Sequence, residues 1–329
     1  MSQLSCIIIA RNEGKNIGRC IGSVMQTIKN IDKSEIILID SYSSDDTVDI
    51  AKSYPIRIIG MRPSWKLSPS AARFTGTNYA CGEYLLFMDG DMELVNGWAE
   101  EAIGFLEANN DVAAVMGKQY DIYVTADGER SEPHVSRDGK GLKYERQVSY
   151  VFQSAVFRRK YLVEAGGFHP FLRAEEEAEL SWRLKKLGYK LYYLPYDSIY
   201  HYSIPRKTFK ETTRRIRNNL WQGMGDTFSW VLYNGEFGVI WDRFMPYIVY
   251  TILAVCITTG IFINSGNSRI VFTVLACLLF IGISIKKGSV HQAVLSLINI
   301  SVISLCLIGG VFRKIPAIDK YPKDAIAVK

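Results

Sequence analysis

The chain has 329 residues, 48% of them hydrophobic, so it is long enough for one large domain or two small ones with a sizeable core. Its 39 basic and 33 acidic residues leave a net charge of +6 that is not arranged as a nucleic-acid-binding stripe, and we expect no nucleic-acid partner. The six cysteines include no CxxC pair, so we expect free thiols in a reducing compartment.

Short apolar runs alternate with amphipathic segments from the first residues to Pro195. The runs that predict strands are Cys6–Ala10, Glu35–Asp40, Ile56–Ile59, Tyr84–Met88, Val112–Gly117, Tyr150–Arg159 and Tyr189–Pro195. The segments that predict helices are Arg11–Val24, Thr47–Tyr54, Ser70–Gly82, Gly97–Asn109, Lys160–Phe168 and Glu175–Gly188. A polar stretch, Thr125–Lys143, is expected to form a long loop. Strands that alternate with helices predict an α/β fold with a mainly parallel sheet covered on both faces.

Polar and acidic residues follow three of the predicted strands, at Arg11–Glu13, Asp40–Asp46 and Asp89–Asp91. Ligands of such sheets bind beyond the carboxyl ends of the strands, so these residues should meet at one edge. Asp89 and Asp91 flank a single glycine, and two carboxylates so placed suit a divalent cation that carries substrate phosphates. An isolated D-x-D of this kind is more often a solvated turn, but its position after the most apolar strand favours a metal–diphosphate site.

The predicted helix Glu175–Gly188 begins with four acids, at positions 175, 176, 177 and 179. Acids favour a helix start because of the helix dipole, so a solvated helix start is one interpretation. Clustered acids also raise one another's pKa, which suits a general base. His201, after the last predicted strand, is a further candidate, although a lone histidine is more often a hydrogen-bonded polar residue.

The rest of the chain predicts a membrane-associated region. Pro205–Trp221 carries six basic residues and one acid, which fits a helix along an anionic membrane surface. Three apolar runs follow, Met245–Ile263, Ile270–Ile285 and Ala293–Phe312, of which the second is short for a span of about 20 residues. Three crossings would place the basic tail outside, against the positive-inside rule, whereas two would keep it inside. The number of crossings therefore stays open.

These boundaries predict four regions. They are a catalytic domain over 1–204, basic interfacial helices over 205–242, two or three transmembrane helices over 243–313, and a polar tail over 314–329. The chain begins almost at once with a strand-like run and lacks a basic and then apolar leader, so the globular part is expected to face the cytosol.

An ordered set of segments resembles family 2 glycosyltransferases of the GT-A fold, the Rossmann-like fold of nucleotide-diphospho-sugar transferases. The segments are "IIIARNEGKNI", "EIILIDSYSSDDTVDIA", "SAARFTGTNYACGEYLLFMDGDMEL", "VEAGGF" and "EEEAELSWRLKKLGYKLYYLPYDSIYH", between Leu4 and Tyr202. The resemblance leaves out the apolar region, although many relatives also carry membrane segments.

The resemblance implies a role for each matching residue. It implies that the nucleotide contacts Arg11, Asn12, Glu13 and Asp40, that Arg73 lies near the diphosphate, and that Asp89 and Asp91, with His201, lie at the nucleotide and its Mg²⁺ or Mn²⁺. The family's E-D-x-D-L motif matches Glu176–Leu180, which makes Glu177 the catalytic base, with Glu176 and Glu175 as neighbouring candidates. Two positions depart from the family pattern, because Glu177 stands for an aspartate and Phe74 for an asparagine.

Together these features predict an inverting glycosyltransferase in the cytoplasmic membrane, with several crossings and its catalytic domain in the cytosol. The expected donor is a nucleotide sugar, most often a UDP-sugar in this family. The expected acceptor is a hydroxyl of a lipid-linked glycan in cell-surface glycan or polysaccharide assembly. Two alternatives stay open: a polyprenyl-phosphate glycosyltransferase, which has less need of a base, and a non-catalytic nucleotide-sugar-binding protein. A processive synthase is disfavoured because "RIRNNLW" only approaches the Q-x-x-R-W pattern.

Overall fold

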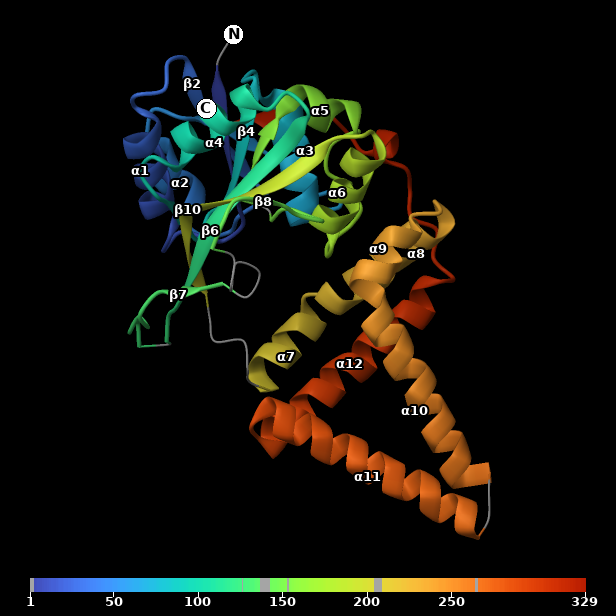
Figure 1. Cartoon of the computed structure of the whole chain (residues 1–329). Helices are drawn as coiled ribbons and strands as arrows, with labels where there is room; N and C mark the ends of the chain where they lie inside the picture. The colour runs from blue at the N-terminus through green and yellow to red at the C-terminus, as the bar shows by residue number, and fades with distance from the viewer. Residues whose placement is uncertain (1–2, 126, 137–142, 153, 204–208, 264–265) are drawn as a thin grey trace. The chain divides into compact units, whose positions relative to one another are not determined.

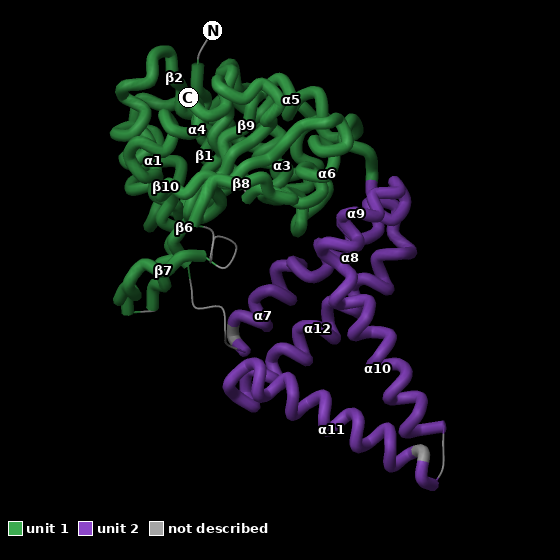
Figure 2. Tube along the Cα trace, viewed as in Figure 1, with its two compact units in different colours: residues 1–204, 316–329 green, residues 205–315 purple. Residues whose placement is uncertain are grey.

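The computed structural model describes the chain except for residues 1–2, 126, 137–142, 153, 204–208 and 264–265 (Figure 1). The chain forms two compact units (Figure 2). Unit 1 joins residues 1–204 with residues 316–329, and unit 2 contains residues 205–315.

A mixed sheet forms the centre of unit 1, with the strand order β11-β3-β2-β1-β4-β9-β6-β10-β5. The strands are β1 Leu4–Ala10, β2 Ser34–Asp40, β3 Arg57–Gly60, β4 Tyr84–Asp89, β5 Met92–Leu94, β6 Val112–Tyr123, β9 Val156–Arg158, β10 Lys190–Ser203 and β11 Ile326–Ala327, with short β7 His134–Val135 and β8 Arg146–Gln147 at the side. Strands β3, β2, β1 and β4 are parallel, and so are β6 and β10. The antiparallel β9 joins the two parallel groups, which confirms an α/β fold with a largely parallel centre.

Helices cover both faces of this sheet because successive strand residues point to opposite sides. The helices of unit 1 are α1 Ile17–Ile28, α2 Thr47–Lys52, α3 Pro69–Tyr79, α4 Trp98–Ala108, α5 Arg159–Glu164 and α6 Glu176–Lys186. Along β1, Cys6 and Ile8 pack into the core beneath α1, α2 and α4, whereas Ile7 and Ile9 pack into the core beneath α3, α5 and α6.

The register of the central strands brings the predicted site residues to one edge. Ala10 at the end of β1 pairs with Asp40 at the end of β2, and Ile9 pairs with Asp89 at the end of β4. The segments that follow these three strands therefore begin side by side.

The polar tail after the last apolar run returns to unit 1. Its strand β11 pairs with β3 through Ile326 with Gly60 and Ala327 with Ile59. Tyr321 is buried in the core beneath α3 and α6, and its hydroxyl donates to the Lys66 carbonyl at 2.8 Å. The residues after 315, expected within a polar tail over 314–329, thus complete unit 1.

Three predicted elements have other limits in the structure. β10 continues to Ser203, so His201 lies within a strand rather than after it. β9 keeps only three residues of the run predicted over 150–159, of which residue 153 is outside the described part. Of the basic helix predicted over 205–221, residues 205–208 lie outside the described part, residues 209–217 form a helix, and a break follows at Asn219, whose φ of 54° is left-handed.

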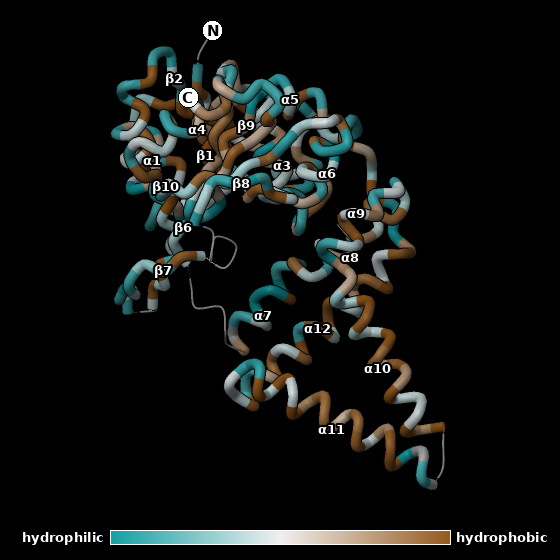
Figure 3. Tube along the Cα trace, in the orientation of Figure 1, coloured by the Kyte–Doolittle hydropathy of each residue, from teal (hydrophilic) through white to brown (hydrophobic). Residues whose placement is uncertain are grey.

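Unit 2 is helical in its described part and apolar over most of its length (Figure 3). Its helices are α7 Phe209–Arg217, α8 Leu220–Tyr233, α9 Phe237–Val239, a π-turn Ile240–Phe244, α10 Met245–Ile263, α11 Asn267–Lys287 and α12 Val290–Gly310. Among the residues that the structure describes, three helical stretches are long and apolar enough to cross a membrane: Phe237–Ile263, Arg269–Lys287 and Val290–Gly310. The second apolar run, residues 270–285, is short for a membrane span. The helix that contains it, α11, has 21 residues and is therefore roughly 30 Å long.

Candidate active site

The loop after β1 is held against the loop after β2. Asn12 has a left-handed φ of 59°; its N–H donates to Ser43 Oγ at 2.9 Å and its Oδ1 accepts from the Ser44 N–H at 2.8 Å. The Glu13 N–H donates to Thr47 Oγ1 at 2.8 Å. These bonds fix Arg11 and Glu13 at the wall of a pocket that Ser41, Asp89, Asp91 and Arg173 also line.

Two carboxylates at this edge of the sheet each have one oxygen with a polar partner and one oxygen without. Asp40 is buried, and its Oδ2 accepts from the Ser43 N–H at 3.1 Å. Asp40 Oδ1 and Asp91 Oδ1 are buried without a hydrogen-bond partner among the described residues. A buried carboxylate oxygen without a partner is costly, so these two atoms are suited to a ligand that supplies a donor or a cation.

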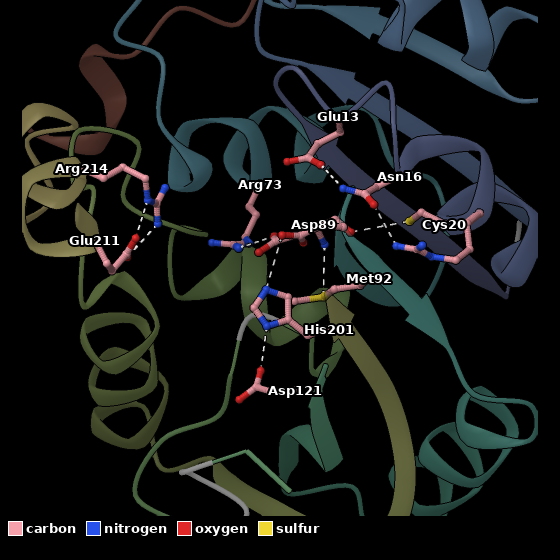
Figure 4. A network of polar contacts seen from close by, with 12 residues as sticks. Glu13, Asn16, Cys20, Arg73, Asp89, Met92, Asp121, His201, Glu211 and Arg214 are labelled. Atoms are coloured by element: carbon pink, nitrogen blue, oxygen red, sulfur yellow. Dashed lines mark hydrogen bonds and ion pairs between the residues drawn. The ribbon is translucent and has the colours of Figure 1, made fainter. Parts of the chain in front are cut away.

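His201 lies between two aspartates, Asp91 and Asp121, and Figure 4 shows its contact with Asp121. The His201 Nδ1 is 2.9 Å from Asp121 Oδ1, and its Nε2 is 3.5 Å from Asp91 Oδ2. Burial lowers the pKa of His201, but the two aspartates outweigh it and raise that pKa to about 10. The imidazole therefore contributes positive charge beside Asp91 when no other cation is bound.

Arg73 on α3 connects the D-x-D segment to the acidic start of α6. Its side chain is 2% exposed, and its Nη2 donates to Asp89 Oδ1 at 2.7 Å (Figure 4). Its Nη1 lies 3.1 Å from Glu176 Oε1 and 3.5 Å from Glu177 Oε1. One buried guanidinium thus fixes the distance between two segments that are far apart in sequence.

The acids that start α6 have different surroundings. The Glu176 side chain is 6% exposed and hydrogen-bonded to Arg73, whereas that of Glu177 is 21% exposed. Burial and the charge of Glu176 raise the pKa of Glu177 to about 8. Glu179 is fully buried and accepts two bonds of 2.7 Å from Arg183, which is a structural pair within the helix. Of these three acids, Glu177 is the most accessible to a second substrate.

The residues present fit a divalent cation that takes few protein ligands. Within the described part of the chain, no three His, Cys, Asp or Glu side chains form a ready metal cage. Asp91 nevertheless offers a buried hard oxygen without a partner, with Asp89 two residues away. Mg²⁺ is commonly held by one or two carboxylates and completed by substrate phosphates, so this donor set suits a cation that arrives with a diphosphate.

The structure brings the predicted residues Arg11, Glu13, Asp89 and Asp91 to one pocket. Asn12 lies in the loop after β1, and Asp40 is the last residue of the neighbouring strand β2. Arg73 links Glu176 and Glu177 to the pocket through Asp89. It also adds two residues that sequence reasoning missed. Arg173 lines the pocket and donates to the Leu67 carbonyl at 2.7 Å, and Asp121 holds His201. A carboxylate within the apolar strand β6 was the available signal for Asp121.

Comparison with known proteins shows that the sequence and the fold are similar to those of sugar-transferring enzymes. The sequence model of glycosyl transferase family 2 matches residues 5–169. The glycosyltransferase SunS of Bacillus subtilis (strain 168) is 41% identical over 88 residues, which cover 27% of this chain and 20% of that protein. The O-antigen chain rhamnosyltransferase WbaN of Salmonella anatum is 28% identical over 197 residues, which cover 54% of this chain and 60% of that protein. The chain thus spans only a fifth of the first relative.

Solved structures share the fold of unit 1. The S. aureus TarS fragment 1–349 in complex with UDP-GlcNAc has a TM-score of 0.50 at 16% identity, over 68% of this chain and 64% of that one. GalNAc-T7 with UDP, GalNAc and Mn²⁺ has a TM-score of 0.50 at 18% identity, over 62% and 44% of the two chains. These likenesses confirm the predicted GT-A fold.

Proposed function

Because the chain belongs to glycosyl transferase family 2, we propose that it transfers a sugar from a UDP-sugar to a hydroxyl of a lipid-linked glycan, with inversion of configuration at the anomeric carbon. The observation that carries the proposal is the Arg73 bridge, which joins the D-x-D aspartate Asp89 in the pocket wall to the partly exposed acid Glu177. The solved structures of similar fold that hold UDP-GlcNAc or UDP with Mn²⁺ support this class of donor.

The donor is bound by residues on three segments. Asp40 Oδ1 is free to accept from the base, and Arg11 and Glu13 line the pocket in which the nucleotide binds. Arg173 provides positive charge at the same wall. Bound Mg²⁺ or Mn²⁺, held by Asp91 with Asp89 and His201 as neighbours, would supply positive charge that stabilises the departing diphosphate.

Glu177 acts as the general base. Its carboxylate takes the proton from the acceptor hydroxyl while that oxygen forms a bond to the anomeric carbon. The bond from that carbon to the diphosphate oxygen breaks on the opposite face, so a single displacement inverts the centre. Arg73 keeps the Glu177 carboxylate oriented and offsets the charge of Glu176 and Asp89 around it.

The acceptor is a lipid-linked glycan at the cytosolic face of the cytoplasmic membrane. Three apolar helices follow the catalytic residues, and a basic helix, α7, precedes them. The relative named O-antigen chain rhamnosyltransferase supports a role in cell-surface glycan assembly. The protein is thus expected to meet acceptor molecules that are confined to the bilayer.

The test is sugar transfer by membranes that contain the full chain. A panel of radiolabelled nucleotide sugars is incubated with these membranes, and the lipid extract is analysed. We expect label from one UDP-sugar to appear in a lipid-linked product. The Asp91→Ala variant should lose this labelling. Asp32→Ala is the control, because Asp32 is an exposed acid outside the pocket lining, and it should keep the labelling. Equal labelling by Asp91→Ala would defeat the proposal. Label on a lipid phosphate instead of a glycan hydroxyl would move the chain to the polyprenyl-phosphate class.

A further inference from the structure

The C-terminal residues decide how the chain passes through the membrane. Unit 1 is built from residues on both sides of unit 2, because residues 316–329 belong to the same compact body as residues 1–204. This return is extensive. β11 pairs with β3, the Val328 N–H donates to the Ile58 carbonyl at 2.9 Å, and Arg62 forms an ion pair with Asp324 at 3.4 Å.

A single folded domain lies on one side of a bilayer. All three helices long and apolar enough to cross a membrane, as far as the chain is described, lie in unit 2. The chain therefore leaves unit 1 before α7 and returns to it after α12 on the same side. The number of crossings between these points must be even, so three helices cannot all cross.

The packing of α12 identifies the helix that does not cross. The apolar window of α12 is 33% buried within the structure, against 6% for the stretch that contains α10 and 0% for α11. A helix with a third of its apolar window covered by its own protein presents less surface to lipid than α10 or α11.

Most of the cover of α12 comes from α8 and α7, although α10 also contacts it where the Tyr250 hydroxyl lies 3.1 Å from Ser301 Oγ. The Phe209 and His291 rings of α7 and α12 are 5.2 Å apart, and Thr212 Oγ1 donates to Asn299 Oδ1 at 3.0 Å. Further along, a Cβ on Gly225 of α8 would collide with the backbone of Cys306. The α7–α8 pair and α12 must therefore occupy the same depth.

The charges of α7 and α8 fix that depth. Glu211 on α7 binds Arg214 and Arg215, and Asp226 on α8 forms an ion pair with Arg313 at 2.7 Å. α8 has only 14 residues, which is too short to cross about 30 Å of hydrocarbon. Charged residues are excluded from the bilayer centre, so α7, α8 and the helix packed along them belong at the membrane–water boundary.

We propose that the chain crosses the membrane twice, through α10 and α11, and that α12 lies with α7 and α8 at the surface on the side of unit 1. The distribution of charge agrees with this arrangement. Lys286 and Lys287 at the end of α11 return to the side of unit 1, whereas Arg269 is the basic residue near the far connector. Gly260 of α10 lies against the Phe272 ring of α11, which makes these two helices a packed hairpin.

The experiment maps which connectors face unit 1, with the full chain in cell membranes. The background protein has alanine in place of the four cysteines outside the core, which are Cys81, Cys256, Cys277 and Cys306. Single cysteines are then introduced into this background. Each is labelled with a membrane-impermeant maleimide, first in sealed vesicles and then after detergent is added. A variant that keeps Cys81, exposed on unit 1, marks the side of that unit. Two positions report on each connector: Asn267→Cys and Arg269→Cys, Lys287→Cys and Val290→Cys, and Lys314→Cys and Lys320→Cys.

We expect the pair at 267 and 269 to be labelled from the face opposite to Cys81, and the other two pairs from the same face as Cys81. Labelling of the 287/290 pair and the 314/320 pair from opposite faces would show that α12 crosses, and would overturn the proposal. Labelling of the 267/269 pair together with Cys81 would exclude the hairpin and overturn it as well. Because the map reads only membrane sides, it is independent of whether the proposed sugar transfer is right.

Discussion

Replacement of Glu177 by glutamine removes the proposed base and little else. The amide has nearly the same shape, and its oxygen can still accept from Arg73, which lies 3.5 Å from the present carboxylate. A positioned general base contributes about 100- to 10,000-fold to a rate. That range corresponds to about 3 to 5 kcal/mol of activation free energy, so we expect kcat to fall by at least about 100-fold with the fold intact.

The pH profile gives a second readout of the same change. With the Glu177 pKa raised to about 8, the carboxylate is the minor form at pH 7 and the major form above pH 8. Because only the ionised form accepts a proton, kcat/KM of the wild type should rise about tenfold between pH 7 and pH 9. Glu177→Gln should lack this rise.

The assay follows transfer from the labelled nucleotide sugar to extracted acceptor lipid at several pH values. Glu175→Gln is the matched control, since it neutralises the adjacent acid; it should keep the rate and the pH rise, which shifts to lower pH because the charge of Glu175 helps to raise the pKa of Glu177. A Glu177→Gln enzyme with more than half of the wild-type rate and the same pH profile would refute the assignment of the base.

Three further predictions concern the supports of the site. Arg73→Met should lower the free energy of unfolding by about 3 to 5 kcal/mol, because it leaves buried carboxylates without their cation; an unchanged thermal midpoint in detergent would contradict this. Tyr321→Ala should cost about 3 to 5 kcal/mol of stability. Tyr321→Phe, which loses only the bond to the Lys66 carbonyl, should cost about 1 kcal/mol, and equal costs would show that the ring is not packed as described. Chelation by EDTA should stop sugar transfer and Mn²⁺ or Mg²⁺ should restore it, so full transfer in EDTA would exclude the metal.

The edge that carries Asp40, Asp89 and Asp91 was predictable because it follows from local patterns. Each aspartate ends or follows a short apolar run, and parallel strands place their carboxyl ends together. Nothing beyond strand recognition is needed to bring these carboxylates to one side of the sheet.

Other features depend on contacts between distant residues, which a single sequence does not display. The two-residue strand β11 has no periodicity of its own and exists because β3 has an open edge. The role of Arg73 as a bridge depends on α3 and α6 lying close together, which spacing alone does not reveal. The break between α7 and α8 at Asn219 depends less on distant contacts, because asparagine itself tolerates the left-handed conformation.

The central claim is that Asp91 binds the diphosphate of a sugar nucleotide through a divalent cation. Its most direct test is calorimetric titration of UDP into the purified full chain with Mn²⁺ present, comparing the wild type with Asp91→Asn and with Asp32→Asn as the control. Loss of a charged contact of this kind should weaken binding by about tenfold or more for Asp91→Asn and leave Asp32→Asn unchanged. Equal UDP affinity in all three proteins would contradict the account.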